Sequence, residues 1–178
     1  MSVLTVKAAK ERASQLLSQA NIDNEDFEIK CMLEQVKKIR LNLLSEDITL
    51  TTDEAEHFFE LVKRRARGEP LQYILGCWEF YSLPFWVGKG VLIPRADTEI
   101  LVDTVLEAII DLRCPDIIDL CAGSGAIAVA IAKTRPDAAV DALEFSKEAL
   151  QYLKQNTVLN QTEQINIIHG DLFEYNPK

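Results

Sequence analysis

The stretch from Ile117 to Ala128 constrains the fold of this 178-residue chain more than any other. Its sequence, IIDLCAGSGAIA, places an apolar strand before Gly123 and Gly125 and an apolar helix start after them. Glycine in a strand-to-helix turn permits backbone angles and a close approach that a Cβ atom obstructs. The first N–H groups of a helix beginning near Ala126 face a ligand, because they have no partners within the helix. The stretch therefore predicts the first half of a βαβ unit with a ligand loop.

Acidic residues follow the next two predicted strands. Glu144 comes after the apolar run 139–143, about 20 residues beyond the glycines, where a carboxylate bonds ribose hydroxyls. A third strand over 165–168 leads to Asp171, whose carboxylate suits the exocyclic amine of adenine. The glycine loop, Glu144 and Asp171 together predict a site for one adenosine.

Asp119 helps to choose the ligand. The segment from Gly123 to Ala128 also fits the dinucleotide fingerprint with Ala in its last place, so a nicotinamide-dependent reductase is an alternative. However, Asp119 precedes the first glycine by four residues, which makes the loop longer and more acidic than a turn that holds a pyrophosphate. A ligand with an amino acid end and no phosphate, such as S-adenosylmethionine, suits this loop better.

Further motifs carry a family resemblance. The run 119–132 resembles the first motif of S-adenosylmethionine-dependent methyltransferases. Upstream, the segments GEPLQYILG (68–76), WEF (78–80) and LIPRADTE (92–99) resemble the HemK/PrmC type, which methylates the side-chain amide of a glutamine in peptide chain release factors. The resemblance covers essentially the whole chain, and the Ile-Pro-Arg-x-x-Thr-Glu segment is much more specific than the glycine loop.

The resemblance implies an α/β architecture in three parts. Residues 1–70 are expected to form an N-terminal helical bundle that binds the release factor, and residues 71–92 a β-hairpin connector. Residues 93–178 are expected to form an incomplete S-adenosylmethionine-binding domain with strands 3-2-1 of a Rossmann-like sheet.

The resemblance also implies the site residues. Cys121 stands where the family usually has Gly, and its small side chain is expected either to fit or to narrow the pocket beside the methionine end. Arg95, Thr98 and Glu99 either position the substrate or cap a helix. The expected cofactor-binding residues are Asp119, Cys121, Ala122, Gly123, Ser124, Gly125, Glu144, Asp171 and Leu172.

The family's catalytic Asn-Pro-Pro-Tyr tetrapeptide, which follows a fourth strand, does not occur in this chain. The ending Asn176-Pro177-Lys178 lacks the second Pro and the Tyr. We therefore expect the cofactor half of the enzyme, no catalytic residue, and weak or absent catalysis by the chain alone. Strand 117–120 is expected to be an exposed apolar edge, through which an otherwise monomeric chain could associate. An adenine-N6 DNA methyltransferase and a non-catalytic release-factor binder remain alternatives.

Composition narrows the partners. A formal net charge of -9 repels phosphate backbones, so no direct nucleic-acid binding is expected. The basic run Lys63-Arg64-Arg65-Arg67 is interpreted as a solvated face near a helix C-terminus. No apolar run approaches the roughly 18 residues of a membrane span. Four cysteines without metal-type spacing are interpreted as buried side chains in a reducing cytoplasm, with no metal site.

Periodicity predicts the remaining elements. The first 70 residues predict helices and no strands: one over 5–20, a second starting at Asp23 or Asn24, and a third opened by a Thr51–Glu54 capping box and ended by Gly68 and Pro70. A hairpin is predicted around Tyr81-Ser82, and a helix from residue 97 or 98 to 112. The side chains expected to face inward are Phe27, Cys31 and Leu33 in the second helix, Ala55, Phe58, Phe59, Val62 and Ala66 in the third, and Leu101, Val105, Ala108 and Leu112 in the last.

Overall fold

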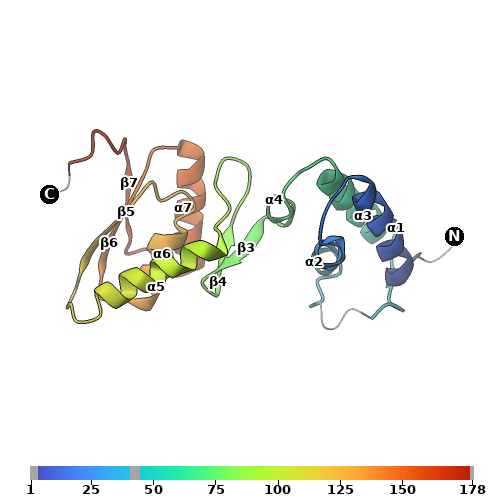
Figure 1. Ribbon diagram of the computed structural model, residues 1–178, viewed down its shortest axis with the longest axis horizontal. Helices are drawn as coiled ribbons and strands as arrows, with labels where there is room; N and C mark the ends of the chain where they lie inside the picture. Colours follow the sequence, from blue (N-terminus) through green and yellow to red (C-terminus); the bar gives the residue numbers. More distant parts are fainter. Residues whose placement is uncertain (1–3, 41–44, 177–178) are drawn as a thin grey trace. The chain divides into compact units, whose positions relative to one another are not determined.

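The computed structural model describes residues 4–40 and 45–176, so Pro177 and Lys178 of the C-terminal tripeptide lie outside the described residues (Figure 1). The chain divides into two compact units, Met1–Leu75 and Gly76–Lys178. Each unit is described by itself.

The first unit is mainly helical, and its elements are β1 (Leu4–Thr5), α1 (Val6–Gln19), α2 (Glu25–Lys37), β2 (Thr49–Leu50), α3 (Thr52–Ala66) and α4 (Leu71–Leu75). The prediction of no strands here was wrong, because β1 and β2 pair antiparallel. Each of these strands has two residues, too few for an alternating pattern, and their pairing joins segments that are far apart in the sequence.

Helix α1 confirms its prediction within one residue at each end. The Thr5 side chain caps it by accepting a hydrogen bond from the Ala8 N–H at 3.2 Å. One apolar stripe is buried, which consists of Val6, Ala9, Ala13 and Leu17. The helix therefore packs through the face that its period of 3.6 residues predicts.

Helix α2 begins after Asn24 as predicted, but its inward face was placed wrongly at Phe27. The Phe27 side chain is 50% exposed, whereas Ile29, Met32 and Leu33 are buried. These three residues have i, i+3, i+4 spacing, and Phe27 lies on a different side of the helix. Asp26 and Phe27 of the first turn thus face solvent.

Helix α3 confirms both ends of its prediction. Thr51 and Glu54 form the reciprocal capping box, with the Glu54 N–H donating to Thr51 Oγ1 at 3.2 Å and the Thr51 N–H to Glu54 Oε2 at 2.8 Å. Gly68, with φ of 91°, follows the helix. Phe58 and Val62 of the predicted stripe are fully buried.

The basic run lies at the C-terminal end of α3, as the sequence indicated. Arg64 pairs with Glu69 at 2.5 Å, and Arg65 pairs with Glu28 of α2, also at 2.5 Å. Because two of its four cations are already paired within the chain, the run is less available to a phosphate backbone than the sequence alone suggests.

The second unit opens with the predicted hairpin, formed by β3 (Cys77–Phe80) and β4 (Leu83–Trp86). The connecting residues Tyr81 and Ser82 have φ of 51° and 57°, the two positive values of a type I′ turn. This turn type matches the twist of the paired strands, so the hairpin prediction is confirmed.

The helix after the hairpin differs from its prediction. A short 3-10 segment, η2 (Ala96–Thr98), leads into α5 (Glu99–Ala108), which ends four residues before the predicted Leu112. Leu101 and Leu112 are exposed, and Val102 and Ile109 are buried instead. The segment is apolar on several sides, so periodicity alone did not fix which side faces the core.

The rest of the unit is a parallel sheet with its helices: β5 (Asp116–Leu120), α6 (Ala126–Thr134), β6 (Ala139–Glu144), α7 (Lys147–Leu159) and β7 (Asn166–His169). The strand order β5-β6-β7 confirms the predicted strands 1, 2 and 3, with β5 at one edge. Helices α5, α6 and α7 lie on one side of the sheet (Figure 1). The core is packed between them and the inner face of the sheet.

Candidate cofactor site

Parallel strands place their carboxyl ends at the same edge of the sheet, and ligands of open α/β sheets bind there. In this chain that edge holds a cavity of about 290 Å³. It brings together the predicted residues Cys121, Glu144, Asp171 and Leu172, which lie at or just after the carboxyl ends of three different strands. The full lining is Cys121, Leu143, Glu144, Phe145, Gly170, Asp171, Leu172 and Phe173.

Glu144 is the buried carboxylate of this cavity, with 8% of its surface exposed. Its Oε2 accepts a hydrogen bond from the Gly123 N–H, and its Oε1 accepts one from the Ser146 N–H, both at 2.7 Å. A carboxylate offers about four acceptor positions, so about two remain for ligand hydroxyls. Glu144 thus links the end of β6 to the glycine loop and still has acceptor capacity.

The glycine loop has a tightly held backbone. Cys121, Gly123 and Gly125 have φ of 63°, 58° and 80°, which lie in the left-handed region that glycine adopts without cost. The Ala122 N–H donates to the Leu143 carbonyl at 2.9 Å, and the Gly125 N–H donates to the Ala122 carbonyl at 2.7 Å. The predicted residues 122–125 therefore lie beside Glu144, although they do not line the cavity themselves.

Cys121 and Cys114 correct the expectation of buried cysteines, because both are exposed, whereas Cys31 and Cys77 are partly buried. Cys121 has a left-handed backbone, with φ of 63°, and lines the cavity. Its apolar sequence neighbours gave no sign of this.

Asp119 holds the start of α6. Its Oδ2 accepts a hydrogen bond from the Ala128 N–H at 3.1 Å, one of the helix N–H groups that the sequence assigned to a ligand. Burial raises the pKa of this carboxyl from 3.8 to about 6, the negative charge of Glu144 adds to the rise, and the Ala128 hydrogen bond opposes it. The structure therefore places two interacting carboxylates beneath the glycine loop.

The raised pKa of Asp119 predicts how stability depends on pH. The folded chain binds this proton more tightly than the unfolded chain, so the ionised carboxylate costs stability above pH 6, and the cost disappears as the pH falls toward 4. Asp119→Asn keeps an acceptor for Ala128 and removes the charge. We expect the variant to be more stable than the wild type by roughly 1–3 kcal/mol at pH 7 and by almost nothing at pH 4.

Urea denaturation at a series of pH values measures this difference. Subtracting the wild-type free energy of unfolding from that of the variant at each pH removes the contributions of the remaining carboxyls. A difference that stays constant from pH 4 to pH 7 would contradict the proposed burial of the charge.

Arg95, Thr98 and Glu99 do not line the cavity. Thr98 precedes α5 without a capping hydrogen bond from its side chain, and Arg95 is exposed. Glu99 Oε1 accepts a hydrogen bond from the Tyr81 N–H at 2.8 Å. Glu99 therefore stabilises the turn of the hairpin, a role that the sequence did not suggest.

The sequence missed four residues that line the cavity: Leu143, Phe145, Gly170 and Phe173. Two of them carried a signal, because Phe145 and Phe173 follow the predicted acidic residues closely, and an aromatic ring there suits a flat base. The two rings are 67% and 94% exposed. Asp171 Oδ1 accepts a hydrogen bond from the Phe173 N–H at 2.9 Å, which fixes the turn that carries this ring.

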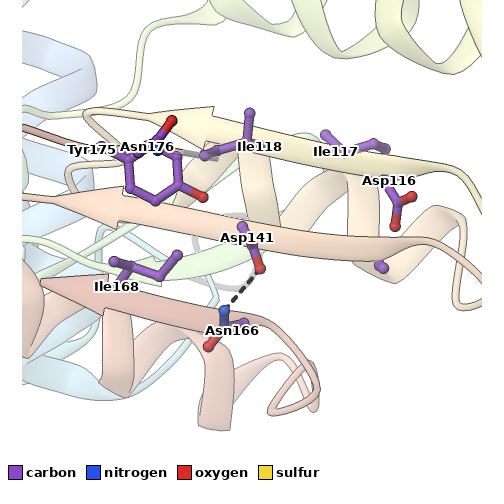
Figure 2. A pocket seen from close by; sticks show the side chains of 9 residues that line it. Asp116, Ile117, Ile118, Asp141, Asn166, Ile168, Tyr175 and Asn176 are labelled. Atoms are coloured by element: carbon purple, nitrogen blue, oxygen red, sulfur yellow. Dashed lines mark hydrogen bonds between the residues drawn. The ribbon is translucent and has the colours of Figure 1, made fainter. Parts of the chain in front are cut away.

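A larger cavity, of about 490 Å³, lies on the face of the sheet opposite the helices. Figure 2 shows Ile118, Asp141 and Asn166 side by side on the three strands, with Ile168 further along β7 and Tyr175 and Asn176 near Ile118. The Asn166 side chain donates to Asp141 Oδ1 at 2.9 Å across this face. None of the predicted site residues lines this cavity. Ile118 and Leu120 of the edge strand β5 are 37% and 44% exposed, as predicted for an apolar edge.

A glycine loop, an acid after the second strand and an acid after the third, on a parallel sheet flanked by helices, define a Rossmann-like methyltransferase of the class that uses S-adenosylmethionine. Family models agree with this class. Residues 8–76 match the PrmC N-terminal domain, and residues 96–178 match the methyltransferase small domain. The chain belongs to the HemK/PrmC family of methyltransferases, which confirms the resemblance seen in the sequence.

Individual relatives are named release factor glutamine methyltransferases. A release factor glutamine methyltransferase of Thermodesulfovibrio yellowstonii is 40% identical over 151 residues, which are 84% of this chain and 53% of the relative. One of Fusobacterium nucleatum is 34% identical over 165 residues, 91% of this chain and 47% of the relative. The chain thus spans about half the length of these two curated relatives.

A solved structure, M. jannaschii TYW2 in complex with AdoMet, is similar over 56% of this chain and 44% of its own, with 21% identity and a TM-score of 0.47.

Within residues 4–40 and 45–176, no helix combines the length and apolar character needed to cross a membrane.

Proposed function

We propose that this chain binds S-adenosylmethionine at the cavity of Cys121, Glu144 and Asp171 and serves the methylation of a glutamine side-chain amide in a peptide chain release factor. The observation that carries the cofactor proposal is the convergence of these three residues, which lie at the carboxyl ends of three strands, on one cavity. The substrate proposal is supported by the relatives named release factor glutamine methyltransferases.

The residues at this edge suit the two parts of the cofactor's nucleoside. Glu144 has free acceptor positions for the two ribose hydroxyls, and Asp171 is an acceptor for the exocyclic amine of adenine. Leu172 and the exposed rings of Phe145 and Phe173 offer apolar surface to the base. A volume of about 290 Å³ lies just below the roughly 300–1,000 Å³ of small-molecule sites, so it suits a nucleoside better than a dinucleotide.

Charge favours this cofactor over a nicotinamide dinucleotide. Asp119 and Glu144 place two carboxylates next to the glycine loop, and no Lys, Arg or His among the described residues forms an ion pair with either. S-adenosylmethionine supplies a methyl group on a positively charged sulfonium, next to an ammonium group. A cation gains from nearby carboxylates, whereas the pyrophosphate of a dinucleotide is repelled.

The cofactor proposal is tested by calorimetric titration of the chain with S-adenosylmethionine, S-adenosylhomocysteine and NADH. We expect the first two to bind and NADH to bind at least about tenfold more weakly, a discrimination of about 1.4 kcal/mol. Equal or tighter binding of NADH would overturn the assignment.

The substrate proposal needs a separate assay, in which the chain receives S-adenosylmethionine with a labelled methyl group and either a release factor or DNA. Label on the release-factor glutamine supports the proposal, and a release factor with glutamate in its place is the control. Label on DNA adenine contradicts it. Transfer by these 178 residues is expected to be slow, because they lack the family's Asn-Pro-Pro-Tyr tetrapeptide.

A further inference from the structure

Asn156 in α7 is a polar side chain with no exposed surface. Its Oδ1 accepts a hydrogen bond from the Trp86 N–H at 2.7 Å, and its Nδ2 donates to the Trp86 carbonyl at 3.1 Å and to the Ser124 carbonyl at 2.9 Å. Both hydrogens of the amide and its oxygen are therefore used. One buried side chain thus bonds the hairpin and the glycine loop at the same time.

The two bonds to Trp86 complete the outer edge of β4. In an antiparallel pair, the N–H and C=O groups of alternate residues point away from the partner strand. Both Trp86 groups are satisfied by Asn156, and the Pro84 carbonyl accepts from Asn160 Nδ2 at 2.9 Å. Asn156 and Asn160, one helical turn apart, together hold the hairpin against α7.

Only Asn156 of these two bonds the glycine loop. The Ser124 residue that it contacts is 4% exposed, and the neighbouring Gly125 packs against Leu153 of the same helix. On the other side, Glu144 holds the Gly123 N–H. The loop is therefore fixed from β6 through Glu144 and from α7 through Asn156.

We infer that Asn156 is a positioning residue of the cofactor site: it locks the backbone of residues 122–125 to the hairpin, and so sets the loop geometry that the cofactor meets. The effect on cofactor binding rests on the proposed function, whereas the fixing of the loop by Asn156 does not. Asn156 acts through Ser124 and does not line the cavity.

Asn156→Ala is compared with Asn160→Ala, which also removes a bond to the hairpin but none to the loop. Amide hydrogen exchange is followed at Gly123 and Gly125, whose N–H groups are both hydrogen-bonded in the folded chain. We expect Asn156→Ala to speed exchange at these two amides at least about tenfold relative to Asn160→Ala, because a local opening exposes them. A general loss of stability would speed exchange to a similar extent in both variants, and that result would overturn the inference.

The wild-type chain offers a second measurement, which does not depend on a variant that folds. If Asn156 joins the hairpin to the loop, the amides of Trp86 and Gly125 open together, with the same denaturant dependence of exchange. If the Gly125 amide opens at a clearly lower denaturant concentration than the Trp86 amide, the inference is contradicted.

The two exchange measurements need no cofactor, so they separate this inference from the proposed function. Calorimetry then measures the consequence: Asn156→Ala is expected to weaken S-adenosylmethionine binding about tenfold, and Asn160→Ala less than about twofold. If the loop amides respond but no chain binds the cofactor, the proposed function fails and the positioning role stands. If the wild type binds the cofactor and the loop amides do not respond, the positioning role fails alone.

Discussion

Replacing Glu144 by Ala is expected to lower the affinity for S-adenosylmethionine at least about 100-fold, and the free energy of unfolding by about 2–4 kcal/mol. The carboxylate accepts two backbone N–H groups, from Gly123 and Ser146, and the substitution leaves both without a partner next to a buried strand end. It also removes the acceptors proposed for the ribose hydroxyls. Calorimetry measures the affinity, and urea denaturation measures the stability.

Glu148→Ala is the matched control. Glu148 carries the same charge four residues further on, in the first turn of α7, is exposed, and accepts a hydrogen bond from the Ser146 hydroxyl at 3.1 Å. We expect Glu148→Ala to lower the free energy of unfolding by no more than about 0.5–1 kcal/mol, since it removes an exposed charge near a helix N-terminus. We also expect it to leave cofactor affinity unchanged. If Glu144→Ala binds the cofactor as tightly as Glu148→Ala, the assigned site is wrong.

Gly125→Ala is expected to destabilise the second unit by about 2–4 kcal/mol and to abolish cofactor binding. Gly125 has φ of 80°, and a Cβ atom there would lie 2.3 Å from Cδ1 of Leu153. The Leu153 side chain is fully buried, so it cannot swing into solvent, and relieving the contact must displace neighbouring core atoms. The substitution thus combines backbone strain with overpacking.

Gly123→Ala separates these two costs. Gly123 also has positive φ, at 58°, but the nearest atom to an added Cβ is the Cys121 carbonyl oxygen at 4.0 Å. We expect a loss of only about 1–2 kcal/mol, the cost of a left-handed backbone. Equal losses for the two variants would show that the contact with Leu153 does not matter.

Tryptophan fluorescence suits the stability measurements. The chain has two tryptophans, and both Trp78 and Trp86 lie in the hairpin of the second unit. Their emission therefore reports on the unit that contains Gly125 and Glu144, without a contribution from tryptophans in the helical unit.

Local signals in the sequence were the ones that proved reliable. The capping box of Thr51 and Glu54, the turn at Tyr81 and Ser82, and the strand–glycine–helix order around Gly123 each depend on a few adjacent residues. The parallel sheet also followed, because strands that alternate with helices leave few other arrangements. The convergence of Glu144 and Asp171 was predicted from this topology, since parallel strands end at one edge.

Side-chain direction was less predictable where helices are apolar on more than one side. Phe27 and Leu101 were assigned to the core but are exposed, because the side that faces inward depends on what packs against the helix. Cys121 was expected to be buried because its sequence neighbours are apolar, but it is exposed at the cavity.

The sequence by itself determined the strand and helix order of the second unit and the residue types at the carboxyl ends of its strands, since both depend on local pattern and chain connectivity. Only the tertiary structure decided which groups hold these residues in place. Asn156, Trp86 and Ser124 are far apart in the chain, and Glu99 meets the turn of the hairpin only after folding. Hydrogen bonds between distant segments leave no periodicity in a sequence, because each depends on a single pair of positions that the fold brings together.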